Sequence, residues 1–519
     1  MVTPTTAPEL AEPHLRGLLA SIGLDVEYVR GSGDTLYYRD TDGAEIPVLD
    51  LVGGYGSLVF GHNHPRLVER ARELLEQQVP VHAQFSYHPY ANELAHELNT
   101  VLRRELGVDE PYHALFGNSG AEAVEIAMKH AELDRVVRVG ALRARVAETW
   151  AAVQASAPAV PADVTERLEL PDTATLDDVV AAAARLNEES FTRAPVFLAL
   201  EGGFHGKLAG SVQLTHNPGY RMPFSALAAQ ARFVPAAPGA TAAAADAERA
   251  EVIVPEVVDG VLRLTVERSP VVAALFVEPV QGEGGIRVLD RTVAAEIRSV
   301  ADEAGFPVVV DEVQSGMGRT GRFFAAAHSG LAGDYVLLAK GIGGGVAKSS
   351  VTLIRGSRYQ GDFELVHSST FAKDAFSVHI GLEVLRMLEE DGGAAYARAA
   401  ERGAALRAEL EAVRAEFPDV VSDVRGEGLM LGVEFADLTA SPDPVLAENA
   451  AHGLIGYVLA GHLLRRHAVR VFPTASAPHT LRAEPSIYLT DEAITQFGSA
   501  LRELCGLLRK EDGAALLPV

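Results

Sequence analysis

The sequence predicts an α/β protein with a large, mostly parallel sheet and a smaller carboxyl-terminal unit. Between Ala114 and Arg355, apolar runs of about four to seven residues alternate with helical segments, which is typical of buried parallel strands joined by crossover helices. After Phe376 the pattern changes to long helices, a strand at residues 428–435 and a final helix-strand-helix segment. The length of 519 residues also favours more than one unit.

The composition restricts the classes of partner. The 70 acidic residues outnumber the 45 basic ones, and the formal charge of −25 argues against a protein held on nucleic acid by phosphate contacts. Hydrophobic residues make up 48% of the chain, yet no apolar run approaches the roughly 20 residues that cross a bilayer. Cys505 is the only cysteine, and residues 1–19 lack the pattern of a secretory signal. We therefore expect a soluble cytoplasmic protein with no nucleic-acid or membrane partner.

Along the chain, we expect boundaries near residues 60 and 375, which divide it into segments 1–60, 61–375 and 376–519. Short strands with a turn at Asp42-Gly43 are predicted within 28–51, and a helix at 64–78 begins near Pro65. Helical patterns at 378–388 and 394–417 open the third segment.

Two stretches interrupt the alternation of strands and helices. Residues 133–193 are rich in Ala, Arg and Glu, with breaks at Pro158, Pro161 and Pro171, and predict a helical insertion. Residues 236–250 are dominated by alanine and predict a surface excursion. Their charged residues are typical of solvated helix faces, and nothing in their composition identifies a partner.

Polar residues follow the apolar runs of the predicted sheet. Glu201 follows 196–200, Glu278 follows 271–277, Asp311 follows 308–310, and Lys340 follows 335–339. Ligands of parallel sheets bind beyond the carboxyl ends of the strands, so we expect these four residues to converge on one crevice.

A candidate anion site lies at Asn118-Ser119-Gly120-Ala121-Glu122. Ser119 with Glu122 three residues later is a capping box, which places a helix amino terminus and its free N–H groups here. Such an end, with Gly120 and a serine hydroxyl, suits a phosphate group. Most capping boxes serve only the helix, so this motif alone leaves both interpretations open.

Lys340 and Asp311 supply two further groups. Lys340 precedes the glycine-rich residues 341–345, and a lysine in a partly dry site has a depressed pKa and can form a Schiff base. Asp311 can cap the next segment, or it can lie beside a pyridine nitrogen and keep that nitrogen protonated. An anion cradle, an imine-forming amine and a counter-ion for the ring are the groups that pyridoxal 5′-phosphate requires, and together they favour this cofactor.

These residues belong to a longer series of motifs, and the chain resembles the class III pyridoxal phosphate-dependent aminotransferases (the ornithine, acetylornithine, putrescine and 4-aminobutyrate group). The resemblance covers about residues 31–507 outside the two interrupting stretches. It implies a type I fold, with a large, mostly parallel-sheet domain and a smaller α/β domain that both chain ends build. The motifs, in chain order, are Gly61-His62-Asn63-His64-Pro65, residues 118–122, Phe204-His205-Gly206, Glu278-Pro279-Val280-Gln281-Gly282-Glu283, residues 311–316 with Gly318-Arg319-Thr320-Gly321, Lys340-Gly341, Ser369-Thr370-Phe371 and Arg482.

The resemblance implies a role for each matching residue. Lys340 would form the Schiff base with the cofactor and carry the proton during transfer, and Asp311 would hold the protonated ring nitrogen. The other implied cofactor ligands are Ser119, Gly120 and Ala121 at the phosphate, Phe204 and Val313 on the two ring faces, Gln314 at the phenolic oxygen and His205 beside the ring.

By the same resemblance, Thr370 would reach the phosphate bound to the neighbouring subunit, which implies a homodimer with shared active sites. Arg482 would bind the α-carboxylate of an acid substrate, and Glu283 would pair with Arg482 when the donor has no such carboxylate. The competing interpretation of such a pair is a permanent surface salt bridge. Tyr55 matches the segment that lines the substrate entrance.

The chain departs from the family pattern at two places near the substrate. Ala372-Lys373-Asp374 replaces the usual Gly-Gly-Asn, and Pro485-Ser486, preceded by Glu484, replaces the usual Pro-Pro. Both changes leave the identity of the substrate open.

The favoured function is transfer of an amino group, at a terminal carbon, from an amine or amino acid to 2-oxoglutarate or pyruvate by a ping-pong mechanism. Alternatives are a racemase, aminomutase or decarboxylase of the same fold, and a catalytically silent scaffold that binds the cofactor. Residues 316–321 fit the GxGxxG dinucleotide fingerprint, but five residues separate them from the apolar run, which argues against nicotinamide binding. His62 and His64 lack a third ligand nearby, so we expect no metal.

Overall fold

A mixed seven-stranded sheet forms the centre of the computed structural model, which describes residues 11–40, 42–82 and 85–518. In spatial order its strands are β4 (Tyr112–Gly117), β14 (Ser350–Arg355), β13 (Tyr335–Leu338), β12 (Val308–Asp311), β9 (Val272–Val277), β5 (Val196–Leu200) and β6 (Ala231–Val234). The pairs from β13 to β6 are parallel, and β14 runs antiparallel to both of its neighbours. The four apolar runs predicted as strands are thus β5, β9, β12 and β13 of one sheet.

The register of this sheet brings the strand ends together. Val310 of β12 pairs with Val277 of β9 and with Val336 of β13. The residues that follow, Asp311 and Glu278, therefore lie side by side at the carboxyl edge of the sheet.

Helices cover both faces of the sheet, as the continuous apolar strands require. On one face Ala127 of α5 (Gly120–Ser156) belongs to the same apolar cluster as Phe276 of β9. On the other face Ile297 of α10 (Arg291–Ala304) packs in a cluster with Val277 of the same strand. Both faces of β9 are therefore buried, which explains its uninterrupted apolar sequence.

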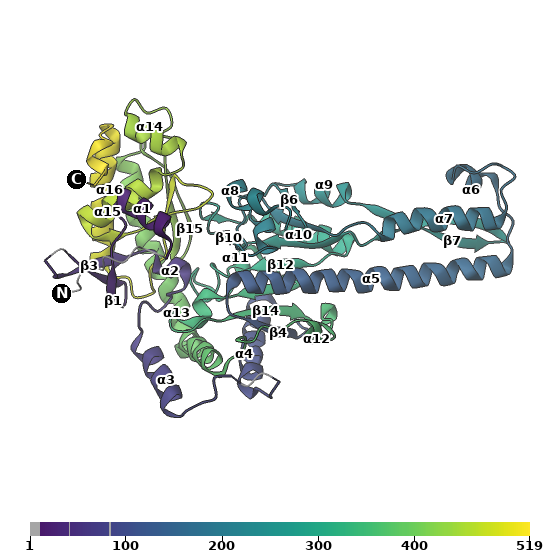
Figure 1. Ribbon diagram of the computed structural model, residues 1–519, viewed down its shortest axis with the longest axis horizontal. Helices are drawn as coiled ribbons and strands as arrows, with labels where there is room; N and C mark the ends of the chain where they lie inside the picture. Colours follow the sequence, from purple (N-terminus) through teal and green to yellow (C-terminus); the bar gives the residue numbers. More distant parts are fainter. Residues whose placement is uncertain (1–10, 41, 83–84, 519) are drawn as a thin grey trace.

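A long arm extends from the sheet (Figure 1) and consists of the second half of α5, α6 (Ala162–Arg167), α7 (Leu176–Phe191) and the hairpin of β7 (Ala250–Val258) with β8 (Val261–Ser269). It has its own apolar core, which includes Trp150, Val179 and Val252. The helices fall within the predicted insertion 133–193, and the Ala-rich stretch forms the short helix α9 (Ala240–Ala247).

The β7–β8 hairpin has no counterpart among the elements expected from the sequence. Its two-residue turn is Asp259-Gly260, with φ angles of 51° and 76°. An Asp-Gly pair that accepts positive φ at both positions, between apolar runs, is a strong hairpin signal. This signal was available in the sequence.

The two chain ends meet in a smaller α/β region at the far end of the molecule from the arm (Figure 1). Strand β3 (Glu45–Asp50) pairs with β2 (Thr35–Arg39) and, in parallel, with β17 (Val469–Arg470), and β1 (Tyr28–Ser32) completes that sheet. A second sheet has the order β15 (Val421–Glu427), β16 (Met430–Phe435), β19 (Thr480–Ala483) and β18 (Phe472–Pro473).

Helices connect and cover these sheets. The longest, α13 (Ala375–Glu416), has non-helical backbone from Glu390 to Gly393, so it consists of two helices, as the two helical patterns in the sequence indicate. The other principal helices are α1 (Pro13–Ser21), α3 (Pro65–Glu76), α4 (Pro89–Leu106), α14 (Pro444–Ala451), α15 (Ile455–His467) and α16 (Asp491–Arg509).

Within the described ranges, no helix combines the length and the apolar character needed to cross a bilayer. Residues 1–10, which open the stretch interpreted as lacking a secretory signal, lie outside these ranges.

Candidate active site

Asp311, the last residue of β12, forms a buried pair with His205. Its Oδ2 atom lies 2.8 Å from Nδ1 of His205, and its Oδ1 atom accepts a hydrogen bond of 3.0 Å from the amide of Val313. Burial opposes a charge on His205, but the hydrogen bond and the negative charge of Asp311 prevail and raise the pKa of the imidazole. The aspartate is therefore fixed in orientation by His205 and by the amide of Val313.

Glu278 lies next to this pair, at the end of β9. Its carboxylate accepts hydrogen bonds from the amides of Phe204 at 2.9 Å and Gly282 at 3.3 Å. Burial raises the pKa of Glu278 to about 7. The carboxylate thus ties the loop after β5 to the loop after β9.

The expected convergence of four strand-end residues is wrong for one of them. The side chain of Glu201 is exposed, and only its main-chain carbonyl reaches inward, where it accepts a hydrogen bond of 2.8 Å from Gln281. The reason is that the chain turns at once through Gly202, whose φ is 82°. The residues of the loop after β5 that contact Glu278 and Asp311 are the later Phe204, through its amide, and His205.

Lys340 follows β13 and has φ of 48°, a left-handed conformation that is uncommon for a residue with a side chain. Its Nζ atom donates to Oε1 of Gln314 at 3.1 Å. Burial lowers the pKa of Lys340, although the nearby carboxylates of Glu484 and Glu283 act in the opposite direction. A larger share of the amine is therefore neutral, and thus nucleophilic, than for a lysine in water.

Glu484 is a member of this site that the sequence marks only as a departure from the family pattern. Its side chain is fully buried, and both of its carboxylate oxygens accept from Nε2 of Gln314, at 2.9 and 3.0 Å. The signal in the sequence is its position two residues after Arg482 in β19, because alternate strand residues point to the same face.

The capping box predicted at the start of α5 is present. Ser119 caps the helix: its Oγ accepts from the amide of Glu122 at 3.3 Å, and the Glu122 side chain accepts from the Ser119 amide at 3.0 Å. Gly120 and Ala121 occupy the first two helical positions, whose N–H groups have no acceptor within a helix. These two amides are free to bind an anion.

Two close approaches place this helix terminus beside the other groups. A Cβ atom on Gly120 would lie 2.7 Å from Cγ1 of Val313, and one on Gly206 would lie 2.8 Å from Cβ of Ala121. Both contacts are too close for any side chain, so glycine is required at each position. The helix terminus therefore touches the loop after β12 on one side and the loop carrying Phe204 and His205 on the other.

Arg482 and Glu283 form a two-point ion pair. Nη1 of Arg482 lies 2.7 Å from Oε1 of Glu283, and Nη2 contacts Oε2, which also accepts from the amide of Ala475 at 2.8 Å. The arginine side chain is 1% exposed and the glutamate side chain 13%, which excludes a surface salt bridge. Burial acts to raise the pKa of Glu283, but the charge of Arg482 prevails and lowers it.

Tyr55 lies at the margin of this pair and is 39% exposed. Its ring centroid is 5.2 Å from the Arg482 guanidinium carbon. Burial of the phenol raises its pKa.

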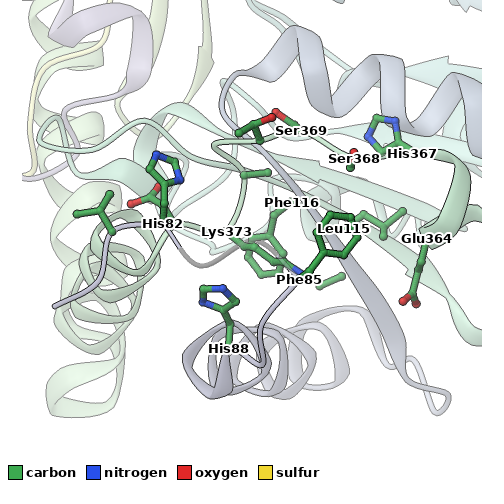
Figure 2. A pocket seen from close by; sticks show the side chains of 15 residues that line it. His82, Phe85, His88, Leu115, Phe116, Glu364, His367, Ser368, Ser369 and Lys373 are labelled. Atoms are coloured by element: carbon green, nitrogen blue, oxygen red, sulfur yellow. The ribbon is translucent and has the colours of Figure 1, made fainter.

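Thr370 lies elsewhere, on an exposed loop that lines a cavity of about 280 Å³ with His82, Phe85 and Lys373 (Figure 2). Its neighbour Ser369 accepts a hydrogen bond of 3.0 Å from the side-chain amide of Asn118. Among the described residues, no recorded contact joins Thr370 to Lys340 or Asp311. A role for Thr370 at the phosphate thus calls for a second subunit.

The remaining patterns do not form sites of their own. Residues 316–321 form consecutive turns rather than the strand-to-helix turn of a dinucleotide fold. His62 pairs with Asp50 at 2.8 Å, and His64 accepts from the amide of Arg66 at 3.3 Å, so both serve local structure.

The described residues fit pyridoxal 5′-phosphate. Free amides stand at the start of α5, a fixed carboxylate lies at the end of β12, and the amine of Lys340 lies at the end of β13. In addition, Nε2 of His205 is buried without a hydrogen-bond partner in the described part of the chain. A buried polar atom without a hydrogen-bond partner is typical of a site that binds a ligand.

Comparisons with known proteins agree with this arrangement. A family model described as Aminotransferase class-III matches residues 23–479. The ornithine aminotransferase from Toxoplasma gondii ME49 is 22% identical to this chain, with a TM-score of 0.66 over 94% of this chain and 92% of that one. A Bacillus anthracis aminotransferase is 20% identical, with a TM-score of 0.66 over 93% of each chain. A second T. gondii ornithine aminotransferase structure, with partial occupancy of pyridoxal phosphate at its active site, is 21% identical and has a TM-score of 0.65 over 94% of this chain and 91% of that one. At these identities the solved structures show a shared fold.

Proposed function

The chain belongs to the class III aminotransferase family, whose cofactor is pyridoxal 5′-phosphate, and from this premise we propose which amino group it moves. The proposed reaction takes a terminal amino group from an amine or amino acid and gives it to 2-oxoglutarate or pyruvate in a ping-pong cycle. The observation that carries the proposal is the buried Arg482–Glu283 pair, whose charges act on Lys340.

When bound, the cofactor supplies an aldehyde that takes up the amino group and a ring that accepts electrons from the reacting carbon. Asp311 would hold the proton on the ring nitrogen, with His205 fixing its orientation through the 2.8 Å contact. Gly120 and Ala121 would donate their amides to the phosphate, and Ser119 would add its hydroxyl. Phe204 and Val313 would pack on the ring faces, and Gln314 would lie at the phenolic oxygen.

Lys340 would act as the base that moves the proton. Its amine must be neutral to remove a proton from the substrate carbon, and burial lowers its pKa toward that state. Gln314 holds Nζ in place through its Oε1 atom, while Glu484 holds the amide of Gln314. The residues thus determine both the protonation and the position of the amine.

Arg482 and Glu283 would allow one pocket to serve two substrates. A donor that carries its amino group on a terminal carbon places no carboxylate at Arg482, so the ion pair stays closed. A keto acid brings a carboxylate that can replace Glu283 in the two-point geometry that a guanidinium favours. Tyr55, at the margin, would contact the part of the substrate nearest to solvent.

A site that takes first a donor without a carboxylate at Arg482 and then a keto acid with one serves two substrates in turn, as transfer requires, whereas a racemase, aminomutase or decarboxylase needs only one substrate. The Arg482–Glu283 pair therefore favours transfer over these alternatives. A silent scaffold has no need of a buried lysine whose pKa is lowered, so Lys340 favours an active enzyme.

We propose further that the enzyme acts as a homodimer in the cytoplasm. Large apolar side chains flank the Thr370 loop on the surface: Phe85 is 100% exposed, Leu365 87%, Val366 69% and Phe371 62%. Exposed apolar residues gathered in this way are typical of an interface. A second subunit seated there would cover them and bring Thr370 to the partner's phosphate site. The cytoplasmic location is supported by Cys505, which is buried and unpaired.

A half-reaction screen tests the proposed function. Single amines and amino acids are added to the purified holoenzyme, and the absorbance of the bound cofactor is followed. We expect a donor with a terminal amino group to convert the spectrum, and 2-oxoglutarate or pyruvate to restore it. Conversion by no amine, or a spectrum that no keto acid restores, would count against transamination.

Lys340→Ala serves as the test of the amine, with Lys348→Ala, at an exposed position, as the matched control. After borohydride treatment and proteolysis, mass spectrometry should find the cofactor on the peptide with Lys340 in the wild type and in the control. The cofactor attached at any other lysine would contradict the assignment.

A further inference from the structure

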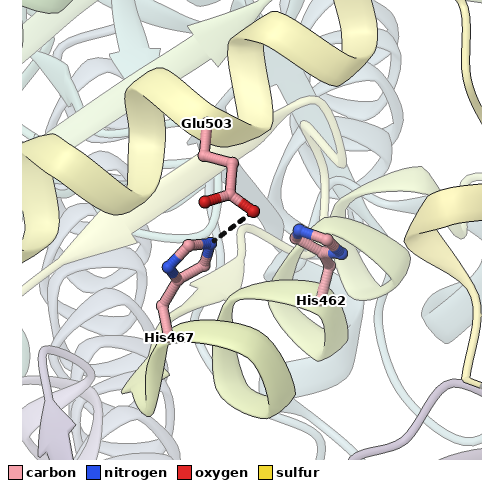
Figure 3. A group of neighbouring side chains, drawn as sticks. All are labelled: His462, His467 and Glu503. Carbon is pink, nitrogen blue, oxygen red and sulfur yellow. Dashed lines mark ion pairs between the residues drawn. The ribbon is translucent and has the colours of Figure 1, made fainter.

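Three side chains with metal-binding atoms lie together in the smaller α/β region, apart from the residues assigned to amino transfer. His462 and His467 belong to α15, and Glu503 belongs to the adjacent α16 (Figure 3). One ligand atom from each lies within 4.8 Å of the other two. The histidines are five residues apart, which is not the common helical spacing of four, and this explains why the sequence gives no metal signal here.

The two histidines leave polar atoms unsatisfied. Nε2 of His462 and Nε2 of His467 are buried, and neither has a hydrogen-bond partner among the described residues. His462 is only 6% exposed, so water reaches it poorly. A buried polar atom without a partner costs about 1–3 kcal/mol, and two in one place call for an explanation.

The distances suit a shared cation better than a hydrogen bond. Nε2 of His467 lies 3.7 Å from Oε1 of Glu503, which is too long for a hydrogen bond. Nitrogen and oxygen ligands at about 2.0–2.2 Å from a tetrahedral Zn²⁺ ion lie roughly 3.4 Å apart. A small rotation of the partly exposed glutamate side chain would therefore complete the geometry.

The ring of His462 lies beside the carboxylate of Glu503 (Figure 3), and its buried Nε2 atom has no hydrogen-bond partner among the described residues. His467 is also the last residue of α15, where the helix dipole favours positive charge.

Neighbouring arginines leave room for a cation. Arg465 is directed away, since its guanidinium donates to the carbonyls of Ile22 at 2.6 Å and Leu516 at 3.0 Å. Arg466 lies 3.7 Å from Glu503, but its side chain is 71% exposed and can move into solvent.

We propose that His462, His467 and Glu503 form a binding site for a divalent transition metal of the Zn²⁺ type, with water as the fourth ligand. The ion would join α15 to α16. Helix α15 packs against β18 and β19, and β19 carries Arg482, so the ion would also brace the strand that holds the substrate-binding arginine. The site does not depend on the proposed amino-transfer reaction.

Calorimetric titration of the chelator-treated holoenzyme with ZnCl₂ tests the site. We expect one ion per chain, and at least a tenfold weaker affinity in Glu503→Gln and in His467→Ala. The matched controls are Glu492→Gln, an exposed glutamate on the same helix, and His452→Ala, an exposed histidine on α14's carboxyl side. Both should bind as tightly as the wild type.

A second readout separates this site from metal held by the cofactor. Zn²⁺ should raise the midpoint of thermal unfolding of the wild type and of Lys340→Ala alike, and should leave that of Glu503→Gln nearly unchanged. The proposal fails if the wild type takes up no ion. It fails equally if Glu503→Gln and His467→Ala bind as tightly as their controls.

Discussion

Glu484 binds Gln314 through both of its carboxylate oxygens, at 2.9 and 3.0 Å, in the interior of the protein. The side-chain amide of Gln314 also accepts a hydrogen bond from Lys340, so the buried carboxylate of Glu484 influences the lysine through Gln314. Among the charges near Lys340, that of Glu484 contributes most to raising its pKa, against the lowering effect of burial. The pKa of the lysine thus depends on two opposing effects: burial lowers it, and the negative charge of Glu484 raises it.

Glu484→Gln is expected to shift that balance. Without the negative charge, burial is less opposed, and the pKa of Lys340 falls further. The rate at which the apoenzyme takes up pyridoxal 5′-phosphate requires the neutral amine, so its pH profile should move to lower pH. The exposed Glu492→Gln serves as control. An unchanged profile in Glu484→Gln would show that the two groups are not coupled.

Asp311→Asn is expected to harm chemistry more than binding. The substitution keeps the size of the side chain but removes the charge that would keep the ring nitrogen protonated. The rate of the half-reaction should fall by about 100-fold to 1000-fold. Cofactor content, measured after denaturation, should stay close to that of the wild type. A loss of cofactor with a normal rate per bound cofactor would assign Asp311 to binding alone.

Glu283→Gln is expected to affect the two half-reactions in opposite directions. The neutral amide pairs weakly with Arg482, so a keto acid no longer competes with a charged side chain, and its apparent affinity should rise. The amine half-reaction should slow, because Arg482 then loses its two-point partner and keeps only the more distant Glu484, 4.0 Å from Nη1, as a counter-ion. Stopped-flow measurement of each half-reaction separates the effects. Equal changes in both would contradict a switching role for this pair.

Arg482→Lys tests the other partner of the pair. A lysine keeps the charge but loses the two-point geometry, so the affinity for 2-oxoglutarate should fall by about 10-fold to 100-fold, which corresponds to about 1.5–3 kcal/mol. The half-reaction with a donor that lacks an α-carboxylate should change much less. A donor affinity that falls as steeply as that of the keto acid would place Arg482 outside acid recognition.

Much of this site follows from local sequence, and the parts that do not follow depend on distant packing. Asp311 and Lys340 are predictable because each follows an apolar run, and the register of a parallel sheet brings the ends of its strands together. Glu201 ends a run as well, yet the turn at Gly202 directs its side chain to solvent. Strand position alone therefore does not fix side-chain direction.

Other features require the folded chain. The contact of Glu484 with Gln314 joins residues 170 positions apart, and no periodicity encodes it. His462 and Glu503 are brought together only when α15 packs beside α16. The β7–β8 hairpin does not depend on distant packing in this way, because its Asp259-Gly260 turn is a signal in the local sequence.

Buried Glu312 makes stability depend on pH. Its carboxyl accepts from Ser315 and from the amide of Ala326, both at 2.7 Å, yet burial raises its pKa from 4.5 to about 7. Between these values the folded state binds more protons than the unfolded state, so the free energy of unfolding decreases as pH rises from 4.5 to 7. The size of this loss is about 3 kcal/mol at most.

Glu312→Gln should remove this loss, since an amide imitates the protonated acid. Urea unfolding at pH 5 and pH 8 measures it: relative to the wild type, the variant should gain stability at the higher pH. The exposed Glu492→Gln should show no such gain. Parallel pH dependence in Glu312→Gln and wild type would mean that Glu312 is already ionised in the folded protein at pH 5.

Hybrid dimers test whether the active site is shared. Thr370→Asp would place a negative charge against the phosphate and, like Lys340→Ala, should inactivate the homodimer. In a hybrid of the two variants, a shared site predicts that one pocket carries both changes and the other carries neither. Dimers isolated through two different affinity tags should then recover about half of the wild-type activity. If Thr370 instead served the pocket of its own chain, each pocket of the hybrid would carry one change, and the isolated hybrid would stay inactive.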